Sequence, residues 1–290
     1  MQKINQPPLI SSLLNHASES LSHHQIPTPR LDAEVLLAQV LKTDRKGLCL
    51  AWGTIVPEQE KETFQNLIAR RIKEEPVSYI IGKKEFWSLT FKVTQAVMIP
   101  RPETETLVEE ALKIFSPQSS PSIVDLGTGS GAISIALATE LPHASIIAID
   151  ISPEALSIAK ENAFSHGVRS IRFIEGNLFE PLEGERTPFD LIISNPPYIP
   201  TNEIPHLPPG IRDYEPAVAF DGGPDGLEFY RKIIREAHHY LNPGGFLLLE
   251  VGKGQGHDVA RIMVETRKFS SPEIINDLSG VVRVVKVYRI

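Results

Sequence analysis

The chain has 290 residues, of which 41% are hydrophobic and 22% are charged, so two compact domains with substantial cores are expected rather than extensive disorder. The formal net charge is −7. Residues 1–75 hold nine basic and nine acidic residues, so the remainder carries the whole deficit. The sequence contains no clustered basic segment of the kind that phosphate binding relies on, which disfavours stable nucleic-acid binding.

The chain lacks the signals of a membrane or secreted protein. No apolar run approaches the roughly 18–20 residues that a membrane helix needs, and the first ten residues contain no continuous apolar stretch, so no secretory signal is expected. The single cysteine, Cys49, cannot form an internal disulfide and is expected to be a buried thiol in a reducing compartment. We therefore expect a cytoplasmic protein that does not associate with membranes.

Residues 1–75 are expected to form a small bundle of three helices. Apolar residues follow the three-and-four spacing of an amphipathic helix over residues 10–21. Thr28 and Pro29 resemble the N-cap and the first position of a second helix, and Pro57 opens a third. Such a bundle could stabilise the rest of the chain or recognise a partner, and the pattern leaves both roles open.

Residues 76–99 are expected to link this bundle to a second domain, residues 100–290. The linker segment EFWSLTFKVTQAVMIP alternates apolar and polar residues and is rich in aromatic and β-branched types, which predicts a β-hairpin. From Ser122 onward strands alternate with helices, a pattern typical of an α/β fold with helices on both faces of a parallel sheet. The terminal segment 281–290 has no helix after it and is expected to be an antiparallel edge strand of a mixed sheet.

A glycine-rich turn follows the first strand of the predicted sheet. Glycines let the chain turn tightly and let a ligand approach the backbone. The third glycine of a dinucleotide-binding turn would fall at Ala132. S-adenosylmethionine has no phosphate, so it needs only room and hydrogen-bond acceptors at such a turn. The residues of the turn are Gly127, Thr128, Gly129, Ser130 and Gly131.

Three residues after the next two strands are candidates for binding an adenosyl group. Asp150 ends the second strand, where a carboxylate can accept hydrogen bonds from both ribose hydroxyls. Ser152 is the better cap for the following helix, so Asp150 is expected to be free. Asn177 is placed to bond the adenine edge, with Leu178 beside the ring, although an ordinary loop asparagine fits the sequence equally well. NAD enzymes and methyltransferases share this geometry.

The most specific motif is Asn195-Pro196-Pro197-Tyr198, which follows the apolar strand FDLIIS. Its prolines fix φ and donate no N–H, so the backbone is stiff and its carbonyls are available to a ligand. The Asn195 side-chain oxygen and the Pro196 carbonyl can accept both hydrogens of a planar amide-type NH₂ group and aim its nitrogen at a methyl donor. The Tyr198 ring can stack on the substrate and favour the positive charge that develops on nitrogen.

The sequence lacks the motifs of several other chemistries, and two roles other than catalysis are the alternatives to methyl transfer. The nine histidines show no metal-ligand spacing, so no metal is expected. The sequence has no nucleophile elbow and no P-loop lysine motif. A strand end stiffened by proline for structure alone, and a non-catalytic module that binds a nucleotide, are the alternatives to an enzyme.

The chain resembles the HemK/PrmC family of protein-glutamine methyltransferases nearly from end to end. The glycine turn and NPPY are shared with many methyltransferases, whereas RPETE and DYEP…GGPDGL are far more particular. The matching segments are IPRPETE (99–105), DLGTGSGAISIALA (125–138), SNPPYIP (194–200), RDYEPAVAFDGGPDGLEFYRKI (212–233), EVGKGQG (250–256) and DLSGVVRVV (277–285).

The resemblance implies a Rossmann-like class I methyltransferase domain, with a mixed seven-stranded sheet and an antiparallel terminal strand, preceded by the helical bundle and the hairpin. It implies methylation, by S-adenosylmethionine, of the glutamine side-chain amide in the GGQ motif of peptide-chain release factors. The same fold acting on a ribosomal-protein glutamine, or on an exocyclic amine of DNA or RNA, is the alternative. The family's helical domain, here residues 1–75, would help to dock the release factor, and we expect a monomer.

The resemblance also assigns roles to individual positions. The glycine turn and Asp150 would bind the cofactor, which Asn195 would also border, and Asn195 to Tyr198 would bind the glutamine amide. Arg101 and Glu103 would lie near the entrance for cofactor and substrate. Two positions depart from the family pattern: Leu178 stands where an aromatic residue is frequent, which implies weaker stacking on adenine, and Ser88 replaces a glycine, with little expected consequence.

Overall fold

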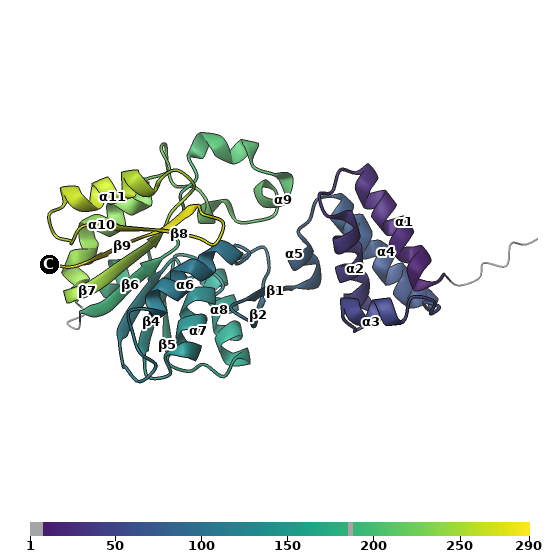
Figure 1. Cartoon of the computed structure of the whole chain (residues 1–290), viewed down its shortest axis with the longest axis horizontal. Coiled ribbons are helices and arrows are strands. Elements are labelled where there is room, and N and C mark those ends of the chain that lie inside the picture. Colours follow the sequence, from purple (N-terminus) through teal and green to yellow (C-terminus); the bar gives the residue numbers. More distant parts are fainter. Residues whose placement is uncertain (1–7, 185–187) are drawn as a thin grey trace, which may run out of the picture. The chain divides into compact units, whose positions relative to one another are not determined.

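The computed structural model describes residues 8–184 and 188–290. The chain divides into two compact units (Figure 1). One contains the described residues up to Gly82 together with Pro209–Tyr214, and the other contains Lys83–Pro208 and Glu215–Ile290. Most of the N-terminal segment used above to assess a secretory signal lies outside the described residues. Among the described residues, no helix combines the length and the apolar character needed to cross a membrane.

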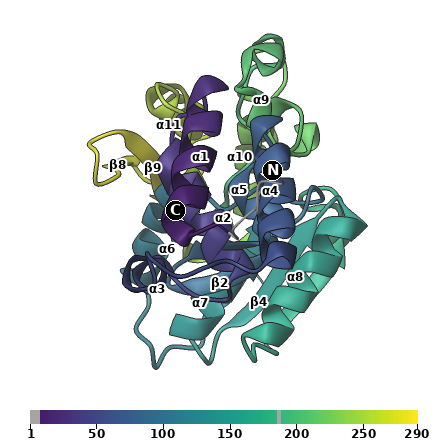
Figure 2. The same ribbon diagram turned by 90° about the vertical axis from the view of Figure 1, so that its right-hand side faces the viewer.

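The first unit is built from helices whose apolar residues are spaced three and four apart. Figure 2 shows α1, α2 and α4, which pack against one another. Their contact buries a core that includes Leu14, Leu21 and Phe64. The helices are α1 (Ile10–His23), α2 (Pro29–Val40), α3 (Arg45–Leu50), α4 (Glu58–Ile72), α5 (Val77–Ile81) and the short α9 (Pro209–Arg212).

The three expected helices correspond to α1, α2 and α4, whereas α3 and α5 were not predicted. Thr28 takes the N-cap position of α2, but its hydroxyl donates to Asp32 Oδ1 at 2.7 Å instead of accepting a backbone N–H. The expectation of a buried Cys49 is wrong, because this residue is exposed on α3. That short helix buries only Leu48 against the bundle.

The predicted hairpin is present, although it begins later than expected. Strands β1 (Lys83–Phe86) and β2 (Leu89–Lys92) pair antiparallel. The residues before them form α5, which ends at Gly82 in the left-handed conformation. The two residues of the turn, Trp87 and Ser88, have φ of 52° and 56°. A glycine at position 88 would adopt this conformation without steric cost, which explains the family preference in physical terms.

The second unit holds the expected mixed sheet of seven strands, in the order β5-β4-β3-β6-β7-β9-β8. The terminal strand β9 runs antiparallel to β7, as predicted. It is not the edge, however, because the short β8 pairs on its far side. The strands are β3 (Ser122–Leu126), β4 (Ser145–Asp150), β5 (Ile171–Glu175), β6 (Phe189–Ser194), β7 (Leu241–Glu250), β8 (Glu273–Asn276) and β9 (Val282–Tyr288).

Helices cover both faces of this sheet (Figure 1). One face carries α6, α7 and α8, and the other carries α10 and α11. The strands at the centre are apolar on both faces because both are buried, as is usual for parallel sheets. The helices are α6 (Glu105–Leu112), α7 (Ala132–Glu140), α8 (Pro153–Ser165), α10 (Glu228–Tyr240) and α11 (Gly256–Glu265).

The chain reverses its direction of winding between β3 and β6, which are neighbours in the sheet. Residues after the carboxyl ends of these two strands therefore diverge and leave a crevice, the usual ligand position in open α/β sheets. The glycine turn follows β3, and NPPY follows β6. The two most informative sequence motifs thus meet at one place in the fold.

Candidate active site

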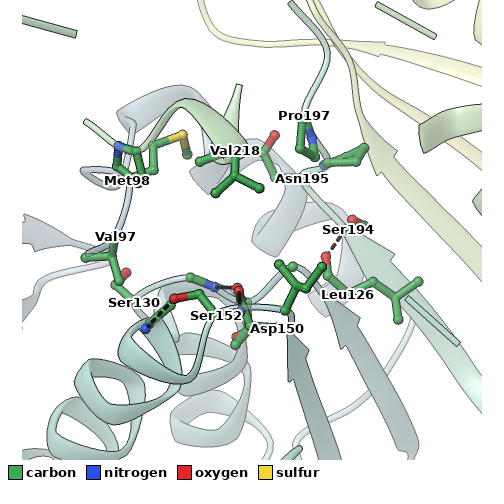
Figure 3. Close-up of a pocket in the computed structure, with 18 of the residues that line it drawn as sticks. Val97, Met98, Leu126, Ser130, Asp150, Ser152, Ser194, Asn195, Pro197 and Val218 are labelled. Carbon is green, nitrogen blue, oxygen red and sulfur yellow. Dashed lines mark hydrogen bonds between the residues drawn. The ribbon is translucent and has the colours of Figure 1, made fainter. Parts of the chain in front are cut away.

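A cavity of about 1120 Å³, part of it open to solvent, lies at this edge of the sheet. In Figure 3, Ser130 and Asp150 lie at its lower side, and Asn195 and Pro197 lie opposite them. Most sequence-predicted site residues line it. They are Gly127, Thr128, Gly129, Ser130, Asp150, Asn177, Leu178, Asn195, Pro196 and Pro197.

The glycine turn is shaped to receive a ligand. The backbone N–H groups of Gly127 and Thr128 both donate to the Ile149 carbonyl, at 2.9 and 3.0 Å, which ties the turn to β4. Gly127 and Gly129 have positive φ, and a Cβ added to either would meet no atom within 4 Å. Gly131 serves packing instead, because its Cβ would lie 2.9 Å from Ile135 Cδ1.

Asp150 holds the turn in place as well as facing the cavity. Ser152 caps α8, as expected, with its hydroxyl accepting from Ala155 N. The expectation that this leaves Asp150 free is wrong, because its Oδ2 accepts from Gly129 N at 2.7 Å and its Oδ1 from Ser152 N at 3.0 Å. Burial raises the pKa of Asp150, and these backbone bonds oppose the rise. Each oxygen retains a lone pair that a hydroxyl could use.

Asn177 and Leu178 form the adjoining wall. The Asn177 amide donates to Glu180 Oε1 at 3.1 Å, which orients its side chain. Leu178 has a φ of 51°, an uncommon conformation for a residue that carries a branched side chain. Backbone strain of this kind tends to occur at ligand sites.

The cavity wall fits S-adenosylmethionine. An adenosyl group needs a carboxylate for its ribose, an apolar wall for its base and room at a turn free of side chains. Asp150, Leu178 and the open glycine turn provide these three features within one cavity. These residues would therefore hold the cofactor.

Behind the turn lies Asp125, a buried carboxylate that was not predicted as a site residue. It is fully buried, and its Oδ2 accepts from the hydroxyls of Thr128 and Ser134, each at 2.7 Å. Its Oδ1 has no hydrogen-bond partner among residues 8–184 and 188–290. Burial raises the pKa of Asp125 to about 6. The side chain fixes the Thr128 end of the turn.

On the opposite side, Asn195 directly follows β6. The preceding Ser194 is fully buried and donates its hydroxyl to the Leu126 carbonyl at 2.6 Å, which joins the ends of β6 and β3. The Asn195 side-chain amide donates to the Thr104 hydroxyl at 3.3 Å. The side-chain oxygen of Asn195 remains available to accept hydrogen bonds. The motif thus presents an acceptor on a wall shared with the cofactor turn.

Tyr198 is the one member of the motif that does not line the cavity. Its ring packs with the core between the sheet and helices α10 and α11, close enough to Gly252 that an added Cβ there would lie 2.9 Å from Tyr198 Cδ2. Burial raises the pKa of the Tyr198 hydroxyl to about 12. Tyr198 is partly buried there, and stacking of its ring on a substrate stays a prediction.

Arg101 and Glu103 do not line the cavity either. Arg101 pairs with Glu215 Oε1 at 2.6 Å, and Glu215 Oε2 accepts from Ile99 N at 2.9 Å. The nearly buried Glu215 therefore fastens two segments that both contribute to the wall, one through Met98 and the other through Val218. RPETE and DYEP, the two most particular segments, are therefore joined by the hydrogen bonds of Glu215, which hold this part of the cavity wall together.

The glycines of GGPDG explain how NPPY is held. A Cβ on Gly222 would lie 2.7 Å from Tyr198 Cα, so only glycine lets the loop approach the motif this closely. Ile199 N donates to the Phe220 carbonyl, and Gly222 N donates to the Ile199 carbonyl, each at 2.8 Å. Sequence reasoning missed this support, because the two segments are brought together only by folding.

Several further lining residues were missed. They are Met98, Thr104, Val218 and Phe229, none of which was predicted as a site residue, although Thr104, Val218 and Phe229 stand within segments that resemble the family. For Thr104, the signal lay in RPETE, whose particularity was noted without a physical reason.

Comparisons with known proteins agree with this geometry. The family described as "PrmC N-terminal domain" matches residues 12–82, and the family described as "Methyltransferase domain" matches residues 117–271. A release factor glutamine methyltransferase from Geobacter sulfurreducens is 44% identical over 276 residues, covering 95% of each chain. Another, from Fusobacterium nucleatum, is 38% identical and covers 94% of this chain and 77% of the relative.

Solved structures share the fold at low sequence identity. A methyltransferase from Pyrococcus furiosus superimposes with a TM-score of 0.51 at 19% identity, over 77% of this chain and 98% of that one. A 16S rRNA methyltransferase from T. thermophilus, in complex with AdoMet and guanosine, gives 0.52 at 16% identity, over 72% and 50%. Together with the near-complete match to curated relatives, these findings show that the chain belongs to the family of release factor glutamine methyltransferases.

Proposed function

We propose that this protein methylates the side-chain amide nitrogen of the glutamine in the GGQ motif of peptide-chain release factors. The observation that carries the proposal is the position of Asn195 and Pro196, on the wall of the cavity that also contains the glycine turn and Asp150. Full-length similarity to release factor glutamine methyltransferases supports the choice of substrate.

The methyl donor is S-adenosylmethionine, which supplies an activated methyl group bonded to a sulfonium. Asp150 binds the ribose hydroxyls, and Leu178 contacts the adenine. The glycine turn lies against the amino-acid portion, where a side chain would obstruct it. These assignments follow from the open space at Gly127 and Gly129 and from the residues that line the cavity.

The chain's own contribution to the reaction is to orient the acceptor nitrogen. An amide nitrogen is a poor nucleophile, because its lone pair is delocalised into the carbonyl. Asn195 Oδ1 and the Pro196 carbonyl accept one N–H each, which holds the nitrogen and favours a pyramidal geometry. Such positioning is able to supply a large part of a rate enhancement. Bound S-adenosylmethionine would supply the methyl group to this nitrogen and leave as S-adenosylhomocysteine, and the nitrogen, held by Asn195 and Pro196, would release one proton to water.

The N-terminal unit is assigned to docking of the release factor, with the enzyme acting as a monomer in the cytoplasm. The match of residues 12–82 to a domain found with this methyltransferase family supports a role particular to its substrate. The charge balance of residues 1–75, with equal numbers of basic and acidic residues, suits recognition of a protein better than recognition of a polyanion.

Transfer of a labelled methyl group tests the proposal. The purified protein is incubated with labelled S-adenosylmethionine and a bacterial release factor, and the site is located by mass spectrometry. We expect one methyl group on the glutamine of GGQ, and none on a release factor whose glutamine is replaced by alanine. Labelling of a ribosomal protein, of DNA or of RNA, with none of the release factor, would contradict the proposal.

A further inference from the structure

The side chain of Glu250 lies next to Asn195 because of strand register. Strands β6 and β7 are parallel neighbours, and Ser194 pairs with Leu249. The next residue of each, Asn195 and Glu250, therefore stands at the same level. Paired residues of neighbouring strands direct their side chains to the same face.

One oxygen of this buried carboxylate is unpaired among the described residues. Glu250 is only 2% exposed, and its Oε2 has no hydrogen-bond partner among residues 8–184 and 188–290. The nearby Tyr230 hydroxyl donates to the Glu250 main-chain oxygen, at 3.0 Å, and not to the carboxylate. Leaving a buried polar atom unpaired costs about 1–3 kcal/mol. A role in packing alone does not account for a carboxylate at this position, because an apolar side chain would avoid that cost.

Charged and polar groups face Glu250 from every neighbouring element. Burial raises its pKa to about 7, against hydrogen bonding to Thr104 and Asn195 and the positive charge of Arg283 on β9. The negative charge of Glu103 raises it further. The hydroxyls of Tyr198, after β6, and Tyr230, on α10, interact with it electrostatically.

The orientation of the Asn195 amide is the consequence that matters chemically. Thr104 bonds the Asn195 NH₂ group, but a hydroxyl both donates and accepts, so on its own it would hold either end of the amide. An ionised carboxylate only accepts hydrogen bonds. Glu250 therefore selects the NH₂ end for the interior and leaves Asn195 Oδ1 for the cavity.

We propose that Glu250 is a positioning residue for methyl transfer, whose carboxylate keeps the NH₂ group of Asn195 turned inward so that Asn195 Oδ1 accepts the N–H of the substrate. This inference rests on the proposed function, which requires an acceptor at that point. A protonated Glu250 would have an O–H that bonds Asn195 Oδ1 instead. The amide would then present its NH₂ group to the substrate NH₂, with donors facing donors.

The role predicts a dependence of turnover on pH. The orienting form of Glu250 is the ionised one, so kcat should fall as the pH drops through about 7. Arg283 stays protonated, and Tyr198, with a pKa raised to about 12, stays neutral over the range tested. If only the ionised form is active, kcat falls about tenfold per pH unit well below the pKa.

Glu250→Gln removes the titration while it preserves the shape of the side chain. A glutamine can offer either its oxygen or its NH₂ to Asn195, so we expect kcat at high pH to fall about tenfold. The KM for S-adenosylmethionine should change little, and the decline of kcat centred near pH 7 should disappear, whereas a decline near pH 6 that belongs to Asp125 of the glycine turn should remain. A structural role alone would not alter the pH profile in this way.

The matched control is Glu110→Gln. Glu110 is also a buried carboxylate, 5% exposed, but it pairs with Lys113 and Lys286, and it does not line the cavity. This variant should keep the wild-type kcat and pH profile. Thermal unfolding and calorimetry of S-adenosylmethionine binding are measured for both variants, so that a loss of folding is recognised.

The outcomes separate this inference from the proposed function. Failure of the wild-type protein to methylate the release factor at any pH overturns the proposed function and the role of Glu250 with it. An active wild type whose kcat stays constant from about pH 5.5 to 8.5 overturns the role of Glu250 alone, and this result needs no variant. Wild-type kcat in Glu250→Gln, or parallel losses of cofactor affinity and kcat, overturns it as well.

Discussion

Replacing Asn195 with alanine should separate cofactor binding from methyl transfer. The side chain provides one of two acceptors for the substrate NH₂ group, and its own amide donates to the Thr104 hydroxyl at 3.3 Å. Removal of one fixed hydrogen-bonding group aimed at a reacting centre lowers kcat about 10²–10³-fold, or about 2.7–4 kcal/mol in the activation free energy. The glycine turn and Asp150 are held by their own hydrogen bonds and remain in place.

The assay is single-turnover transfer of labelled methyl to a release factor, with the Kd for S-adenosylmethionine measured by calorimetry. We expect a Kd within about threefold of the wild-type value and a large loss of kcat. Asn242→Ala is the matched control, because this half-buried asparagine bonds Asp190 at 2.8 Å on β6, away from the cavity. Near-normal turnover of Asn195→Ala would refute the assigned role, whatever the Kd.

Three other substitutions test separate parts of the structure. Asp150→Ala removes the acceptor of the ribose and of Gly129 N, so calorimetry should show S-adenosylmethionine binding weakened by about 1–3 kcal/mol; an unchanged Kd would rule out the ribose contact. Gly222→Ala places a Cβ 2.7 Å from Tyr198 Cα and should lower the free energy of unfolding by about 1–3 kcal/mol in urea titration, whereas unaltered stability would mean that the loop does not need this close approach. Ser88→Gly relieves a left-handed φ of 56° and should raise that free energy by about 0.5–1 kcal/mol; a lower value would contradict the strain argument.

The alternation of strands and helices was sufficient to predict the sheet of the second unit and the strand ends that carry the site. Strand β8 was missed because its four residues, Glu273–Asn276, carry little pattern. Without β8, the terminal strand β9 was expected at the edge of the sheet, whereas it lies second from the edge. The segment Val77–Ile81 is apolar and short, and periodicity over five residues does not separate a helix from a strand.

Only part of the candidate site could be predicted, because local motifs are visible in the sequence whereas contacts between distant segments are not. Asn195 and Asp150 follow strands and belong to local motifs, so their positions could be inferred. The bond from Gly129 N to Asp150 could not be inferred, because it joins residues that are 21 positions apart. Glu250 ends a strand that reads as uniformly apolar, and only the register of β6 against β7 places it beside Asn195.

A crystal structure of the protein with S-adenosylhomocysteine and a peptide containing the GGQ glutamine tests the central claim most directly. We expect the glutamine amide nitrogen within hydrogen-bond distance, about 2.7–3.2 Å, of both Asn195 Oδ1 and the Pro196 carbonyl oxygen. We also expect the cofactor ribose to bind Asp150. A glutamine side chain bound elsewhere on the cavity wall, or an Asn195 that presents its NH₂ group to the substrate, would contradict it.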